Sequence, residues 1–186
     1  VVDDDGKELS VGLQIIALGK GRFQAAGYLG GLPGVGWNGE ARLLMEGQKR
    51  ADGTVVFERE SATLVYDDQR VTVLDEGNEI GTLKKTRRES PTLCKKQPPG
   101  AVELLNGTSG DQWKKGEMDG KLLKQGQTSK QKFGSHTLHV EFRLPYQPED
   151  RGQGRGNSGL YLQGRYEVQI LDSFGLEGKN NECGGI

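Results

Sequence analysis

The residue types best suited to chemistry alternate along three short segments in the second half of the chain. Apolar and polar residues alternate in residues 136–144 (HTLHVEFRL), 157–163 (NSGLYLQ) and 164–172 (GRYEVQILD). A period of two places every second side chain on the same face of a sheet. We therefore expect three neighbouring strands with one shared polar face, made of His139, Glu141, Arg143, Tyr161, Gln163, Arg165, Glu167 and Gln169.

This polar set suits a ligand that is rich in hydroxyl groups. Planar amides, forked guanidinium groups and an aromatic ring are what hydroxyls and sugar ring faces require. Glu141 beside Arg143, or Glu167 beside Arg165, is a candidate general base, and His139 titrates near neutrality. The same residues also fit a plain exposed face in which Glu–Arg pairs only order the strands. The residue types alone leave both interpretations open.

Two carboxylates and a loop flank these segments. Asp172 ends the third segment and Glu182 lies in the turn NNECGG. Each either binds a metal ion or a sugar hydroxyl, or caps a turn. The loop over residues 146–156 (YQPEDRGQGRG) is rich in Gly and is predicted to be a mobile lid. It is not typical of a phosphate-binding loop, because its glycines do not follow a strand and open a helix.

The first half of the chain predicts a meander of short antiparallel strands. Turn residues such as Gly, Asp and Asn separate short β-prone runs at intervals of roughly 8–12 residues. The expected strands cover residues 13–18, 22–29, 42–48, 54–59, 62–66, 70–74 and 79–83. Further short strands are expected at residues 102–107 and 121–124.

Composition supports an all-β protein and excludes several classes. Gly accounts for 30 of 186 residues, and each interior Gly costs a helix about 1 kcal/mol relative to Ala. The Gly content therefore excludes helical bundles and coiled coils. No apolar run is long enough for a membrane-spanning helix. The 25 basic and 26 acidic residues give a net charge of -1, so nucleic acid is not an expected partner. Cys94 and Cys183 sit in no metal-binding motif.

A charged segment with three Pro, residues 85–100 (KTRRESPTLCKKQPPG), is predicted to be a linker. It separates a β-rich region at residues 1–84 from a domain at residues 101–186. The chain starts without Met and ends just after a loop-like run, so we expect a fragment that is inactive and poorly soluble by itself. We expect the full-length protein to be periplasmic or secreted.

Three motifs in the second half are similar to those of a known family. Residues 104–107 (LLNG) and Trp113 match an LFNG-type opening followed by a Trp, and residues 138–143 match a strand of the type FTLHLEFR. Residues 156–173 read GNSGLYLQGRYEVQILDS, against GNSGVYLxGRYEVQxLDS in the family. On these motifs, residues 102–186 resemble the 3-keto-disaccharide hydrolase family. The closing NECGGI is similar to members from planctomycete-type bacteria.

The resemblance implies a concanavalin A-like jelly-roll β-sandwich, incomplete in this chain, with a concave polar sheet. It also implies cleavage of 3-keto-glycosides by elimination and hydration, with a carbohydrate as the partner. Glu167 is then the first choice for the base, because it centres the most specific motif. Arg165 or Arg143 would stabilise the enolate, and Glu141 or His139 would protonate the leaving oxygen.

The remaining members of the predicted site would hold the sugar or a cation. The substrate-binding residues would be Asn157, Tyr161, Gln163 and Gln169. No cofactor is certain, and a divalent cation would have Asp172 and Glu182 as its ligands. An alternative function is a non-catalytic carbohydrate-binding module on the same sandwich, since a fold does not imply activity. A fragment that serves only as an interaction domain is the third hypothesis.

Overall fold

The computed structural model describes residues 1–2 and 5–186, which form two compact units. One unit comprises Val1–Arg87 together with Leu144–Ile186, and the other comprises Arg88–Arg143. Among the described residues every regular element is a strand except one 3-10 turn, so the prediction of an all-β protein is confirmed. No helix in the described part of the chain has the length and apolar character that crossing a membrane would require.

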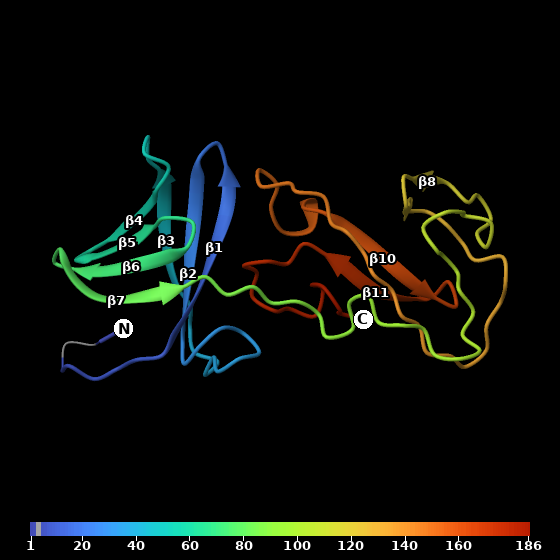
Figure 1. Ribbon diagram of the computed structural model, residues 1–186, viewed down its shortest axis with the longest axis horizontal. Coiled ribbons are helices and arrows are strands. Elements are labelled where there is room, and N and C mark those ends of the chain that lie inside the picture. The colour runs from blue at the N-terminus through green and yellow to red at the C-terminus, as the bar shows by residue number, and fades with distance from the viewer. Residues whose placement is uncertain (3–4) are drawn as a thin grey trace. The chain divides into compact units, whose positions relative to one another are not determined.

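A seven-stranded antiparallel sheet dominates the first unit, and its strands follow one another in sequence order (Figure 1). This is the predicted meander, and all seven expected strands are present. The sheet curls, so that β4–β7 cross the direction of β1 and β2 (Figure 1). The strands are β1 (Val11–Gly19), β2 (Arg22–Leu29), β3 (Leu43–Lys49), β4 (Val55–Arg59), β5 (Ala62–Tyr66), β6 (Arg70–Asp75) and β7 (Asn78–Lys84).

The core of this sheet gathers around Phe57, which is completely buried. Phe57 on β4 pairs with Gly47 on β3, and its ring occupies the space that a Cβ at Gly47 would need. Other buried members of this cluster come from β2, β4, β5 and β6, and they include Ala25, Leu64 and Val73. Removing a phenylalanine side chain from water stabilises the fold by about 1.5–3 kcal/mol.

A second apolar cluster covers the opposite face of β1 and β2. It contains Ile16, Ala26 and Tyr28, with Leu32 and Trp37 packed against it. Successive residues on a strand point to opposite faces, and Ala25 and Ala26 accordingly belong to different clusters. Strands β1 and β2 are therefore packed on both sides, unlike an ordinary surface hairpin.

The second sheet of this unit is the hairpin of β10 (Asn157–Leu162) and β11 (Tyr166–Leu171). Gln163 and Gly164 both have positive φ, and the Arg165 N–H donates to the Leu162 carbonyl at 3.1 Å. Two consecutive positive φ angles characterise the tight reversals that join antiparallel strands, so Gln163 and Gly164 form such a turn. The 3-10 turn η1 (Gly152–Gly154) precedes the hairpin.

The unit of residues 88–143 has little regular structure. It contains only the two-residue strands β8 (Met118–Asp119) and β9 (Leu122–Leu123) among its described elements. The strand expected at residues 121–124 thus appears in shortened form. The strand expected at residues 102–107 is wrong; there, the Leu104 carbonyl accepts a hydrogen bond from the Trp113 indole at 2.7 Å instead of joining a ladder.

The predicted strand at residues 136–144 is also wrong. The segment has no strand assignment, because it pairs with no other strand of the described chain. Its apolar residues are left partly exposed, from 39% for Leu138 to 51% for Phe142. The expected polar face of three strands therefore reduces to two, β10 and β11. The predicted division into residues 1–84, 85–100 and 101–186 stays a prediction.

Candidate functional site

The best-defined polar cluster lies on one face of the β10–β11 hairpin and is centred on Glu167. Tyr161 and Glu167 are cross-strand partners, and the Tyr161 hydroxyl donates to Glu167 Oε2 at 2.8 Å. Glu167 Oε1 lies where a Cβ at Gly159 would be. Gly159 is thus required by the close approach of the carboxylate, because any larger residue would displace it.

This pair is accessible from solvent, and its hydrogen bond shifts the pKa of the tyrosine. Tyr161 is 59% exposed. The hydrogen bond to Glu167 raises the pKa of Tyr161 above its ordinary value, since the carboxylate favours the protonated phenol. Tyr161 therefore stays a hydrogen-bond donor at neutral pH. The predicted Glu167–Arg165 ion pair is not formed in this structure; among the described residues, the side-chain partner of Glu167 is Tyr161.

Amide side chains extend the same face toward the start of β10. Gln169 Nε2 donates to Gln153 Oε1 at 2.9 Å, and Asn157 Nδ2 donates to the Gln153 carbonyl at 2.9 Å. Gln153 Nε2 in turn donates to the Asn181 carbonyl at 2.8 Å. The Gln169 Oε1 atom is buried without a hydrogen-bond partner.

Sequence reasoning missed Gln153, because it lies in the Gly-rich loop that was interpreted only as a lid. The 3-10 turn brings its amide to the hairpin, where it joins Asn157 and Gln169. The available signal in the sequence was Gln153 itself, a polar amide side chain between two glycines. Whether this loop moves as a lid stays a prediction.

A second missed residue, Arg155, fixes the open end of the hairpin. Its Nη2 lies 2.8 Å from Asp172 Oδ2, and its Nη1 donates to the Phe174 carbonyl at 3.2 Å. Arg155 is 9% exposed, so this ion pair is largely shielded from water. The Asp172 N–H donates to the Gly156 carbonyl at 2.8 Å, which continues the ladder one step beyond β11.

The predicted metal ligands are both engaged by protein groups. Asp172 pairs with Arg155, and the buried Glu182 accepts from the Gly178 N–H at 2.7 Å. Neither belongs to a group of three or more His, Cys, Asp or Glu side chains that could hold a metal ion within residues 1–2 and 5–186. The donor set does not fit a divalent cation, and we derive no metal-assisted step.

The other predicted catalytic residues, His139, Glu141 and Arg143, belong to the unit of residues 88–143. Glu141 Oε1 lies 3.1 Å from His139 Nε2 and accepts from the Cys94 N–H at 2.6 Å. The hydrogen bond from His139, followed by that from Cys94, lowers the pKa of Glu141. Glu141 is therefore ionised at neutral pH. Arg143 is exposed, as are Gln163 and Arg165 in the turn of the other unit.

Comparison with known proteins concerns this second half of the chain. Neither the curated proteins nor the solved structures gave a match. Residues 100–186, just under half of the chain, match the sequence model of the 3-keto-alpha-glucoside-1,2-lyase-like domain. The matched range contains Glu167, Tyr161 and the hairpin that holds them. The match confirms the resemblance carried by residues 156–173, and it supports a glycoside-related function of hydrolase or lyase type for this segment.

Proposed function

We propose that this protein cleaves the glycosidic bond of 3-keto-glycosides by elimination, followed by addition of water. The observation that supports the proposal is the Glu167 carboxylate, which lies over Gly159 and is hydrogen-bonded to Tyr161 within a segment that matches a 3-keto-glucoside lyase-like domain. The cluster offers a half-buried base, a neutral donor and several amides on one face. These are the groups that an elimination on an oxidised sugar needs.

In the proposed reaction Glu167 is the base. The ketone at sugar carbon 3 acidifies the hydrogen on carbon 2, and the carboxylate removes it as a proton. The electron pair left on carbon 2 delocalises onto the ketone oxygen as an enolate. Collapse of the enolate forms a double bond between carbons 1 and 2 and expels the leaving group from carbon 1. Addition of water across that double bond then gives the free 3-keto sugar, so the net reaction is a hydrolysis.

Tyr161 is proposed to stabilise the enolate or to orient the carboxylate. Because its pKa is raised, it donates a hydrogen bond throughout the neutral range. Arg165 remains the proposed cation for the charge that develops on the ketone oxygen, where a fixed positive group has its largest effect; the role of Arg143 stays a prediction from the sequence. Asn157, Gln163 and Gln169 are proposed to position sugar hydroxyls, with Gln153 added to this set.

Of the two proton donors predicted from the sequence, His139 and Glu141, Glu141 does not fit that role. A general acid must carry a proton at the working pH. The pKa of Glu141 is lowered, so its carboxyl has already lost the proton at neutrality. His139 stays the predicted donor, and its Nε2 lies 3.1 Å from Glu141 Oε1.

The decisive experiment is the variant Glu167→Gln, assayed with a 3-keto-glucoside that carries a chromogenic leaving group. We expect turnover to fall by roughly 10²–10⁴-fold, the usual contribution of a positioned general base, while the affinity for substrate is retained. Exchange of the hydrogen on carbon 2 with deuterated solvent should fall in parallel. Glu79→Gln on the exposed part of β7 is the matched control and should keep full activity.

Two outcomes would overturn this proposal. The absence of any release of leaving group by the full-length protein would favour the binding-module interpretation. Full turnover in Glu167→Gln would remove Glu167 from the role of base.

A further inference from the structure

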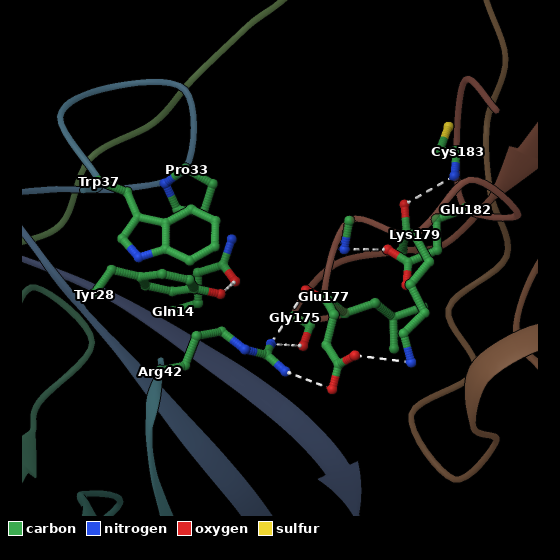
Figure 2. A pocket seen from close by; sticks show the side chains of 13 residues that line it. Gln14, Tyr28, Pro33, Trp37, Arg42, Gly175, Glu177, Lys179, Glu182 and Cys183 are labelled. Atoms are coloured by element: carbon green, nitrogen blue, oxygen red, sulfur yellow. Dashed lines mark hydrogen bonds and ion pairs between the residues drawn. The ribbon is translucent and has the colours of Figure 1, made fainter. Parts of the chain in front are cut away.

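A second site lies on the face of β1 and β2 that carries the Tyr28 cluster, away from the residues around Glu167. It is a cavity of about 280 Å³ (Figure 2). Pro33, Trp37, Tyr28 and Gln14 gather on one side of it, and the segment from Gly175 to Cys183 borders the other (Figure 2). Tyr161, Glu167 and Gln169 do not line this cavity, and its aromatic side precedes the segment that matches the lyase-like domain.

The aromatic side of the cavity is rigid. Tyr28 is 2% exposed and packs edge-on against Trp37, with ring centroids 5.4 Å apart and an interplanar angle of 80°. The Trp37 indole N–H donates to the Glu40 carbonyl at 3.2 Å, which fixes the ring orientation. Such a ring presents an electron-rich face, which attracts the weakly positive C–H groups on one face of a pyranose.

The amide side chain of Gln14 lies beside these rings. The Tyr28 hydroxyl donates to Gln14 Oε1 at 2.7 Å. This bond fixes the amide oxygen, and among the described residues no group accepts from the Gln14 Nε2 hydrogens. Two amide hydrogens with a defined orientation match the oxygen atoms of a sugar hydroxyl pair.

The charged residues of the cavity neutralise one another. Arg42 donates through Nη1 to the Gly175 carbonyl at 2.7 Å, and its Nη2 lies 3.6 Å from Glu177 Oε1. Glu177 Oε2 lies 2.8 Å from Lys179 Nζ. Glu182, the fourth charged lining residue, balances the second cation. Two cations against two carboxylates give the cavity no net charge, which favours an uncharged ligand.

We propose that this cavity is a binding site for a neutral sugar unit, separate from the Glu167 face and non-catalytic. The site stacks one pyranose face against Trp37 and uses Gln14 and the Arg42–Glu177–Lys179 chain for its hydroxyls. Its volume lies at the lower end of the range for small-molecule sites, so it holds about one sugar residue. Through this site the region of residues 1–84 takes part in holding a glycan while another part of the protein acts on it.

The test is a calorimetric or NMR titration of the protein with methyl β-D-glucopyranoside and, in parallel, with the anionic methyl β-D-glucuronoside. We expect saturable binding of the neutral glycoside and weaker binding of the anion. Trp37→Ala should weaken the neutral glycoside by about tenfold, because one aromatic contact is lost. Trp113→Ala is the matched control, since Trp113 does not line the cavity, and it should bind as before.

A second variant keeps the proposal testable if Trp37→Ala does not fold. Glu177→Gln leaves two cations against one carboxylate, so the ratio of affinities should shift by several fold toward the glucuronoside. Trp37→Ala should leave the turnover of a small 3-keto-glucoside unchanged, which separates this site from the proposed catalytic one. The proposal is overturned by absence of saturable binding, by unchanged binding in a folded Trp37→Ala variant, or by an unchanged ratio in Glu177→Gln.

Discussion

At the scale of single residues, the partner of the Glu167 carboxylate decides how well it can act as a base. One interpretation of the sequence paired Glu167 with Arg165, in an ion pair that would only order the face. The structure gives Glu167 the neutral phenol of Tyr161 at 2.8 Å instead. The carboxylate is therefore bonded to a neutral donor and not to a cation. The missing side chain of Gly159 makes room for this arrangement.

The coupling between Tyr161 and Glu167 can be measured directly. Because the Glu167 carboxylate raises the pKa of Tyr161, the variant Glu167→Gln should lower that pKa toward the ordinary value for tyrosine. The measurement is a pH titration followed by NMR of ring-labelled tyrosine. Tyr66 is the internal control, since burial and Asp68 raise its pKa independently of Glu167. A Tyr161 titration that is identical in both proteins would contradict the hydrogen bond.

At the scale of elements, the sequence predicts strands well where their partners are neighbours along the chain. The meander of β1–β7 follows from alternation and turn residues, because each strand pairs with the next one. The same holds for β10 and β11, whose register follows from the turn at Gln163 and Gly164. Residues 136–144 alternate equally well, yet form no strand. Alternation predicts which side chains of a strand would share a face. It does not predict which distant segment would pair with that strand.

The ion pair of Arg155 and Asp172 lies just beyond the paired ends of β10 and β11, where strand register still has predictive value. Counting outward from the turn pairs Asn157 with Leu171, so Gly156 lies opposite Asp172 and Arg155 is the next residue along the chain. Sequence reasoning considered Asp172 by itself, as a metal ligand or turn cap, and did not extend the register past the strand ends. The hydrogen bonds around Gln153 are harder to predict from the sequence, because tertiary contacts set the path of a Gly-rich loop.

This ion pair predicts a stability effect that belongs to the hairpin. Arg155→Met leaves Asp172 without its partner in a shielded position, and losing one member of such a pair costs on the order of 3 kcal/mol. We expect faster amide hydrogen exchange at Leu171 and a lower midpoint in urea. The double variant Arg155→Met/Asp172→Leu should recover part of the loss. Arg165→Met in the exposed turn is the control, and an equal effect there would refute the role of the pair.

At the scale of the whole molecule, the buried apolar residues are unevenly distributed. Every apolar residue that is buried in the described chain belongs to the unit of residues 1–87 and 144–186. The unit of residues 88–143 has two strands of two residues each and keeps Leu138, Val140 and Phe142 partly exposed. Burial of apolar surface is the main source of cooperative stability, so the two units should differ sharply in how they unfold.

The two tryptophans allow this difference to be measured, because Trp37 lies in the first unit and Trp113 in the second. In a Trp113→Phe background, Phe57→Ala should lower the free energy of unfolding reported by Trp37 fluorescence by about 3–5 kcal/mol, the cost of emptying a packed aromatic site. In a Trp37→Phe background, Phe57→Ala should leave the midpoint of the Trp113 transition unchanged. That transition should be broad. Phe174→Ala, at a side chain that is half exposed, should shift either transition by no more than about 0.5 kcal/mol. Coincident, equally steep transitions for both tryptophans would show instead that residues 88–143 share the core of the sheet, since only a shared core makes two regions unfold together.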